Sequence, residues 1–150
     1  MNKEYAGAIK RIAYGYIICL FDINIGTLNL LPDWLGILMI YQSLTPISKY
    51  DKSVKLLDST IMIIFVYEAF NWLLTIFTLE INIYVINVIF GIISLYFHFQ
   101  LITNIADIAR EHHYNKYKTL LISRTLKAVS ITISALPISW EMFSFGMLIY

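Results

Sequence analysis

The chain has 150 residues, of which 59% are hydrophobic and only 14% are charged. Soluble domains are about half apolar and about a quarter charged, so this composition argues against an ordinary water-soluble domain. The formal net charge is +1 and no basic stripe is present, so the sequence offers no nucleic-acid-binding surface. The single cysteine, Cys19, excludes an intrachain disulfide and a cysteine-based metal site, and we interpret it as core filler.

Apolar blocks separated by short charged clusters follow one another along the whole chain. This is the spacing that a bilayer core of about 30 Å requires of helices. We therefore predict an all-α, polytopic transmembrane helix bundle of about five spans, forming one transmembrane domain over residues 1–150. Abundant Ile, Asn, Tyr and Lys with few Ala is typical of an AT-rich bacterial genome.

The first two predicted spans are short and enclose a polar segment. The first covers about 9–21, and because no small-residue cleavage site follows it, we interpret it as a retained span and not a removed signal. The second covers about 33–47, where Pro32 and Asp33 suit the start of a helix. The polar segment 22–33 then lies at depth between two short helices.

The remaining spans follow after the first charged loop. The third covers about 56–79 and the fourth about 81–107. Residues 118–127 carry Arg124 and Lys127 on an apolar stretch, which predicts a segment lying along the membrane interface. The fifth span covers about 128–150, with Pro137 as a kink.

The basic residues are confined to three groups along the chain. Because cytoplasmic loops are enriched in Lys and Arg, this placement predicts a cytoplasmic N-terminus in a multi-pass protein of the cell membrane. The groups are Lys3, Lys10 and Arg11; Lys49, Lys52 and Lys55; and Arg110, Lys116, Lys118, Arg124 and Lys127.

Four ionisable residues, Asp22, Glu68, His98 and Glu141, lie 11 to 14 residues inward from the nearest basic group on four different spans. At 1.5 Å per residue they share a layer about 16–21 Å deep. A charge there costs at least about 2.5–3.5 kcal/mol, so these side chains are expected to face the bundle interior. The layer predicts an interior site for a cation, proton or small polar solute.

Helical spacing supports a shared interior face. Asn87, Gly91, Ser94 and His98 form a small or polar stripe on the fourth span, which would let another helix approach closely. The stripe is expected to meet the third span, with Glu68 against Ser94 or His98. The alternative is that each polar side chain only makes an interhelical hydrogen bond that fixes packing.

The segment 22–33 has two interpretations as well. Irregular backbone at depth is tolerated where it lines a wet cavity or is buried in protein. Asp22, Asn24 and Asn29 would then contribute ligands, and Asn87 a further amide. The alternative is a turn capped by Asn and Asp side chains.

No motif typical of an enzyme is present, so the sequence favours a non-enzymatic protein without a cofactor or a metal site. The adjacent histidines His112 and His113 cannot share one helical face and are interpreted as part of a solvated loop.

Residues 15–44 contain the pattern D-x-N-x-G followed by LPD-x-x-G. The segment resembles a group of small, uncharacterised integral membrane proteins of Firmicutes, clostridia especially, and covers about a fifth of the chain. The resemblance implies a membrane location and no particular activity. The matching residues are Asp22, Asn24, Gly26, Leu31, Pro32, Asp33 and Gly36.

The leading functional hypothesis is a membrane protein that handles a cation, proton or small polar solute through a polar interior site. The alternative is a non-catalytic accessory or scaffold subunit of a membrane complex. The expected partners are the lipid bilayer and either further copies of the chain or another membrane protein.

Overall fold

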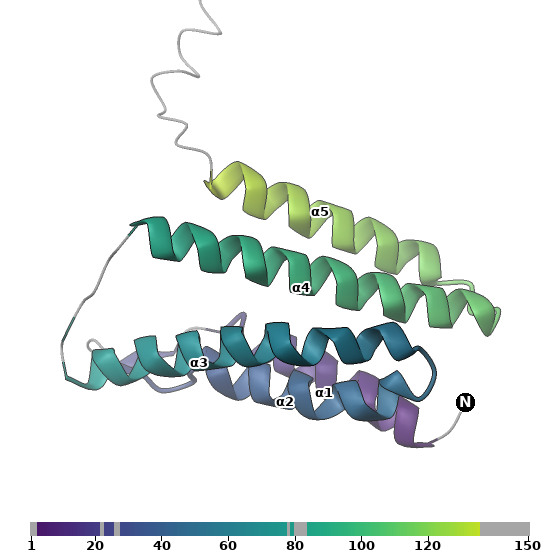
Figure 1. The fold of residues 1–150 in the computed structure, drawn as a ribbon, viewed down its shortest axis with the longest axis horizontal. Helices are drawn as coiled ribbons and strands as arrows, with labels where there is room; N and C mark the ends of the chain where they lie inside the picture. The colour runs from purple at the N-terminus through teal and green to yellow at the C-terminus, as the bar shows by residue number, and fades with distance from the viewer. Residues whose placement is uncertain (1–2, 22, 26–27, 78, 80–83, 136–150) are drawn as a thin grey trace, which may run out of the picture.

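A computed structural model describes residues 3–21, 23–25, 28–77, 79 and 84–135. Within these residues the chain is almost entirely helical, which confirms the predicted α-helical class (Figure 1). The elements are α1 (Lys3–Ile18), β1 (Asn24–Ile25), β2 (Leu28–Asn29), α2 (Asp33–Ser48), the 3-10 helix η1 (Lys52–Leu56), α3 (Leu57–Ile76), α4 (Tyr84–Glu111) and α5 (Tyr117–Ala135).

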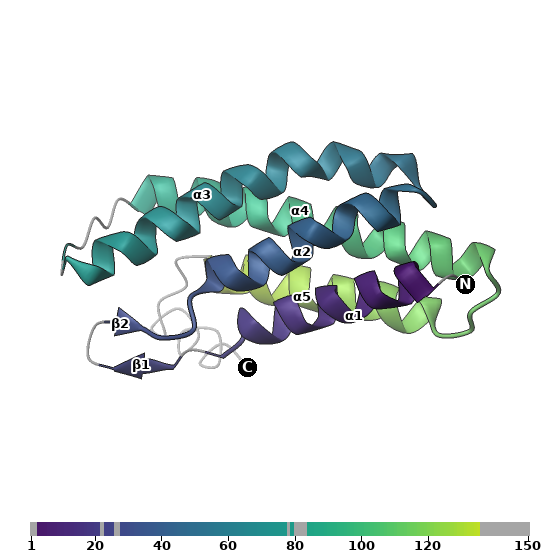
Figure 2. The same cartoon turned by 90° about the horizontal axis from the view of Figure 1, so that it is seen from below.

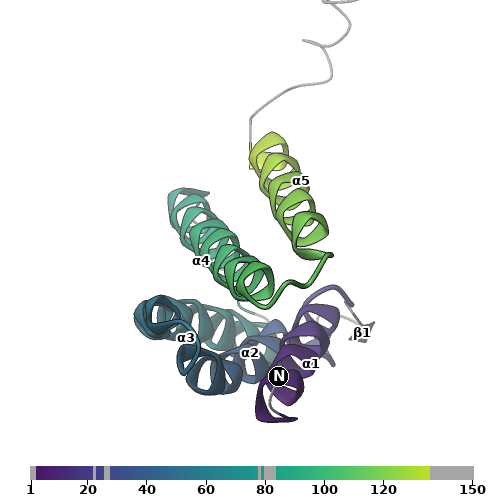
Figure 3. The same ribbon diagram turned by 90° about the vertical axis from the view of Figure 1, so that its right-hand side faces the viewer.

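The helices lie roughly along one axis in three tiers. Viewed end-on, α1, α2 and α3 form a row, α4 lies above that row, and α5 lies beyond α4 (Figure 3). The N-terminus, the α2 to α3 connection and the α4 to α5 connection all lie at one end, and the short hairpin lies at the other (Figures 1 and 2). The lysine- and arginine-bearing connections therefore gather at a single end of the bundle, called the basic end below.

Two glycines allow a close contact between α1 and α2. A β-carbon on Gly15 of α1 would come within 2.6 Å of the Gly36 carbonyl oxygen of α2. A β-carbon on Gly36 would in turn collide with the Gly15 carbonyl and lie 2.6 Å from Cys19 Sγ. In each case the obstacle is a backbone carbonyl of the other helix, which cannot rotate away as a side chain can. Only glycine at both positions therefore allows α1 and α2 to approach this closely.

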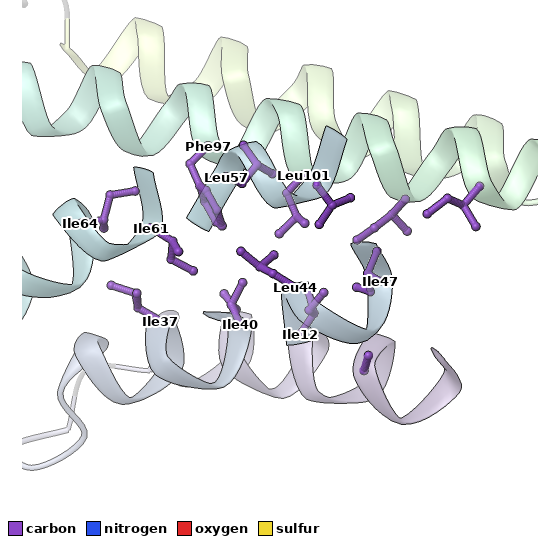
Figure 4. Close-up of a cluster of buried hydrophobic side chains, with 14 of the residues drawn as sticks. Ile12, Ile37, Ile40, Leu44, Ile47, Leu57, Ile61, Ile64, Phe97 and Leu101 are labelled. Carbon is purple, nitrogen blue, oxygen red and sulfur yellow. The ribbon is translucent and has the colours of Figure 1, made fainter. Parts of the chain in front are cut away.

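The core lies between α1, α2, α3 and α4 (Figure 4). Buried positions recur at helical spacing, such as Ile40, Leu44 and Ile47 on α2, which place one stripe of each helix against its neighbours. Leu44 is 0% exposed and Leu101 of α4 is also 0% exposed, so the row and α4 share this core. No described residue of α5 is buried.

Much of the apolar surface faces outward. Among the described residues, two helical segments are long and apolar enough to cross a membrane, Lys52–Ile76 and Tyr84–Glu111. Only 11% of the residues in the most apolar window of each are buried, whereas the core helix of a soluble protein would be mostly buried. Exposed side chains on these segments include Phe70 at 53% and Ile92 at 62%.

The helix boundaries differ from the predicted spans in two places. A two-residue antiparallel hairpin, with Asn24 opposite Asn29, lies inside the segment that was predicted to be irregular. Gly26-Thr27 between paired residues is a hairpin signal in the sequence. The hairpin pairs its own backbone groups, and the Leu30 N–H also donates to the Ile23 carbonyl at 2.8 Å.

The predicted division of 118–150 into an interfacial segment and a separate fifth span is wrong for the described residues. One continuous helix, α5, runs from Tyr117 to Ala135. Arg124 and Lys127 do not interrupt it because both side chains reach neighbouring helices: Arg124 contacts α4 and Lys127 contacts α1. Pro137 and the turn predicted near residues 80–82 lie outside the described residues.

The close approach predicted at Gly91 is also wrong. No heavy atom of another segment would lie within 4 Å of a β-carbon there, so this part of α4 faces outward. The helices α1 and α2 are short, as expected, with 16 residues each. At 1.5 Å per residue each covers about 24 Å, less than a bilayer core of about 30 Å.

Candidate functional site

A cavity lined by both polar and apolar side chains lies inside the bundle at the hairpin end of α1 and α2. Its volume is about 130 Å³, and a water molecule needs about 10–15 Å³ on the same measure, so several waters or a small solute fit. Each of the five helical segments contributes to the wall. The polar lining residues are Tyr16, Cys19, Asp33, Glu68, Ser94, His98 and Lys127.

These polar groups continue apolar core stripes. On α3, Glu68 follows Ile61 and Ile64 at helical spacing, and on α2, Asp33 precedes Ile37 in the same way. The helix faces that form the apolar core thus carry polar residues where they reach the cavity. Packing of the neighbouring core side chains fixes the helices that carry these polar groups.

Tyr16 and His98 connect α1 to α4 across the cavity wall. Tyr16 Oη and His98 Nδ1 share a hydrogen bond of 2.8 Å. The two rings also meet edge to face, with centroids 5.2 Å apart. Because the bond fixes the orientation of the imidazole, His98 presents a defined face to the cavity.

Lys127 brings positive charge from α5. Its Nζ lies 4.7 Å from the centre of the Tyr16 ring, within the range of a cation–π contact. Tyr16 is therefore held by His98 on one side and by Lys127 on another. The single ammonium shares the cavity with two carboxyl groups, those of Asp33 and Glu68.

Asp33 is placed by the start of α2. Pro32 caps the helix in an extended conformation, and Asp33 is the first helical residue, where a carboxylate complements the positive end of the helix dipole. The Cys19 thiol lies 3.5 Å from the Asp33 carbonyl oxygen, at weak hydrogen-bond distance. The glycine crossing and this contact together fix Asp33 relative to α1.

Of the predicted site residues, the structure brings Glu68 and His98 to the same cavity, together with Ser94. Asn87 lies elsewhere, where its Oδ1 accepts a hydrogen bond of 2.6 Å from the Tyr67 hydroxyl. Asn24 and Asn29 pair within the hairpin, and their side chains are outside the described part of the chain. Asp22 and Glu141 also lie outside it.

Tyr16, Asp33 and Lys127 were not predicted as lining groups. Asp33 was assigned only to the helix start and Lys127 to a membrane surface. One feature of the sequence could have identified Lys127 and Asp33 as lining residues. Lys127 precedes Ile131, and Asp33 precedes Ile37, by four residues, so each charged residue lies on the same helix face as an apolar residue that lines the cavity.

The described residues contain no group of three or more His, Cys, Asp or Glu side chains arranged to hold a metal ion. The carboxyl, imidazole and thiol groups instead come from different walls of the cavity. This arrangement suits a solute that occupies the space between the walls or contacts them through water.

No known protein family, curated protein or solved structure matches the chain. The resemblance of residues 15–44 to small membrane proteins of Firmicutes therefore stays a prediction.

Proposed function

We propose that this chain is a multi-pass membrane protein whose polar interior cavity binds a small cation. The observation that carries the proposal is that Asp33 and Glu68, from two different helices, line one cavity inside an otherwise apolar bundle.

The membrane location is supported by the outward faces of α3 and α4. In water these exposed apolar surfaces would drive aggregation, and contiguous patches of this kind are rare on soluble monomers. In a bilayer the same faces meet acyl chains. We propose that all five helices are embedded and that the hairpin beside α3 extends the depth reached by the short α1 and α2.

The proposed orientation places the basic end in the cytoplasm. Lys and Arg are enriched in cytoplasmic loops. The α2 to α3 connection, with Lys49, Lys52 and Lys55, and the α4 to α5 connection, with Lys116, lie together with the N-terminus at this end. The N-terminus then lies in the cytoplasm and the protein is multi-pass in the cell membrane.

A cationic ligand is supported by the charges of the wall. Two residues with carboxyl groups, Asp33 and Glu68, line the cavity together with one lysine, Lys127. A carboxylate buried at membrane depth is costly unless an opposite charge compensates it, so a bound cation would stabilise the cavity. The hydroxyls of Tyr16 and Ser94 add the oxygen ligands that hard cations prefer.

Spin-label accessibility tests the membrane location. On a Cys19→Ser background, labels at Phe70→Cys and Ile92→Cys, both outward-facing, are expected to collide readily with oxygen and poorly with a water-soluble nickel complex in liposomes. A label at Leu126→Cys, 65% exposed on α5, extends the test to that helix. Strong nickel collisions at all three sites would refute embedding.

Thermal unfolding in detergent tests cation binding. Sodium, potassium, magnesium and methylammonium chlorides are compared with N-methylglucamine chloride at equal ionic strength. A ligand at 100 times its Kd stabilises the folded state by about 2.7 kcal/mol, so one of the four is expected to raise the melting temperature of the wild type. Glu68→Gln and Asp33→Asn should remove that rise.

The matched controls are Asp58→Asn and Glu111→Gln, which remove one negative charge each from residues that do not line the cavity. Both should retain the response. The proposal fails if no salt stabilises the wild type, or if the controls lose the response as fully as the cavity variants.

The accessory-subunit hypothesis has one observation in its favour. The exposed residues Ile122, Leu126, Val129 and Ile133 form an apolar stripe along α5, which has no buried residue in the described structure. Such a stripe suits another helix as well as lipid. Cysteine crosslinking from Leu126→Cys in native membranes tests this candidate, with Ser123→Cys, also exposed, as the off-stripe control.

A further inference from the structure

A second cavity lies at the basic end of the bundle, between α1, α4 and α5. Its volume is about 420 Å³, within the range of about 300–1,000 Å³ typical of ligand pockets. Its wall is mainly apolar, with Ile9, Ile105 and Leu120 among the lining residues.

The cavity exists because α1 stands apart from the last two helices. No Cα atom of α1 lies within 8 Å of a Cα atom of α4 or α5, whereas α1 packs closely on α2. Side chains alone bridge this seam. The polar cavity occupies one part of the seam and the apolar cavity the part nearer the basic end.

Polarity changes from the floor of the cavity to its mouth. Tyr5 is 4% exposed and Ile105 is 6% exposed, so these two residues form a buried floor. Tyr114 and Lys116 lie at the mouth and are exposed. Lys116 is the charged member of the lining. An apolar floor below a cationic mouth matches a ligand that is apolar at one end and anionic at the other.

The mouth is held in place by the way α4 ends. Tyr114 N–H donates to the Ala109 carbonyl at 2.8 Å and His113 N–H donates to the Arg110 carbonyl at 3.0 Å. His113 has a φ of 55°, the left-handed conformation that completes a Schellman motif. The motif brings Tyr114 back over Ala109, and both line the cavity.

Charge near the mouth also favours an anion. Asp107, one of the acidic groups of this region, is paired with Arg110 at 3.0 Å. Lys118 lies two residues beyond Lys116 on the first turn of α5, while Glu111 contributes the opposing charge. Basic pockets between membrane helices on the cytoplasmic side recognise the head groups of anionic lipids.

We propose that this cavity takes one acyl chain of an anionic phospholipid, with the lipid phosphate at Lys116. The inference rests on the membrane orientation proposed above, which puts the mouth at the level of the cytoplasmic head groups. It does not depend on the cation site, because the two cavities share no lining residue.

Native mass spectrometry of the detergent-purified chain tests the proposal, with phosphatidylglycerol and phosphatidylcholine of identical acyl chains as probes. The wild type is expected to bind phosphatidylglycerol about fivefold more tightly, the contribution of roughly one lysine near a membrane surface. Lys116→Gln should abolish that preference. Lys118 lies two residues beyond Lys116 and does not line the cavity. Lys118→Gln removes the same charge from the chain and should keep the preference for phosphatidylglycerol.

A variant that fills the cavity distinguishes the contribution of the acyl chain from that of the head group. Ala109→Phe should weaken binding of both lipids at least about tenfold, because an aromatic ring would occupy part of the cavity. Ala13→Phe, at an exposed position of α1, is the matched control. An unchanged melting temperature and cation response of Ala109→Phe would confirm that it folds.

Several outcomes would overturn the lipid site. They are equal binding of the two lipids by the wild type, an equal loss with Lys118→Gln, and undiminished binding by a folded Ala109→Phe variant. Glu68→Gln should leave lipid binding unchanged, so failure of the cation site and failure of the lipid site give different results.

Discussion

The α1–α2 crossing and the seam between α1 and the last two helices differ in how they bring helices together. At the crossing, Gly15 and Gly36 let two backbones touch, and a β-carbon added at either glycine would collide with the other helix. Along the seam, the backbones stay apart and side chains such as Tyr16 and His98 span the gap. Both cavities lie along the seam.

This difference predicts separate roles, with the crossing stabilising the fold and the seam binding ligands. A contact between two backbones admits no extra atom, so it rigidly positions the start of α2 and with it Asp33. A seam bridged by polar side chains leaves room for water or solute and can change width at smaller cost. The first region is expected to dominate the unfolding free energy, and the second is expected to respond to ligands.

The largest expected effect comes from the crossing. Gly36→Ala should lower the unfolding free energy by about 2–3 kcal/mol, because the added β-carbon would collide with the Gly15 carbonyl, which cannot rotate away. Unfolding of purified protein in mixed detergent micelles, followed by circular dichroism, measures the change.

Gly91→Ala is the matched control for Gly36→Ala. A β-carbon at Gly91 meets nothing within 4 Å, so stability should stay the same or rise by up to about 1 kcal/mol from helix propensity. Equal destabilisation by the two variants would contradict the assigned role of the crossing.

The next effect concerns the attachment of α5. Arg124 Nη1 donates to Thr103 Oγ1 at 2.8 Å, and the guanidinium lies 4.0 Å from the centre of the Phe99 ring. Arg124→Ala should cost about 2 kcal/mol, since it removes both a charged hydrogen bond and a cation–π contact. Arg124→Lys keeps the charge but not the planar stacking, so its stability should lie between those of the wild type and Arg124→Ala.

The same micelle unfolding assay measures the Arg124 series. Lys118→Ala, which removes an exposed cation from the same helix, should change stability by less than about 0.5 kcal/mol. If Lys118→Ala is as harmful as Arg124→Ala, positive charge on α5 matters and the contacts with α4 do not.

A smaller effect is expected within the seam itself. Tyr16→Phe should lower stability by about 1 kcal/mol, because it removes the hydrogen bond to His98 and leaves the ring contact with Lys127 in place. The comparison is Tyr14→Phe, whose side chain is 59% exposed and should tolerate the change. Nitrogen chemical shifts of the His98 ring should move only in the Tyr16 variant.

The smallest expected effect is at the surface of the basic end. Glu4 and Lys49 form an ion pair of 2.7 Å, but their side chains are 51% and 58% exposed. Glu4→Gln should therefore change the unfolding free energy by less than about 0.5 kcal/mol, and the difference should vanish at high salt. A loss above about 1 kcal/mol would contradict this expectation and would mean that the exposed ion pair contributes substantially to holding α1 on α2.

The sequence by itself determined the helices and much of their spacing. Apolar periodicity predicted α2 within one residue of its bounds, from 33–47 against Asp33–Ser48, because Pro32 and the following charge mark a helix start. The count of residues inward from the nearest basic group also identified Glu68 and His98 as ionisable groups at a shared depth, and the fold places both on one cavity. Each of these features depends on residues close together along the chain.

Tertiary structure alone decided which stripes meet. Helical spacing predicted close packing at Gly91 and not at Gly36, whereas the structure has the reverse, because α1 crosses α2 at Gly36 and no other segment lies near Gly91. Likewise Lys127 was expected at a membrane surface, yet its ammonium lies over the Tyr16 ring more than a hundred residues away along the chain. The physical reason is that helical periodicity gives the direction in which a side chain points. The distance to a neighbouring helix, by contrast, is set by all the contacts along both helices.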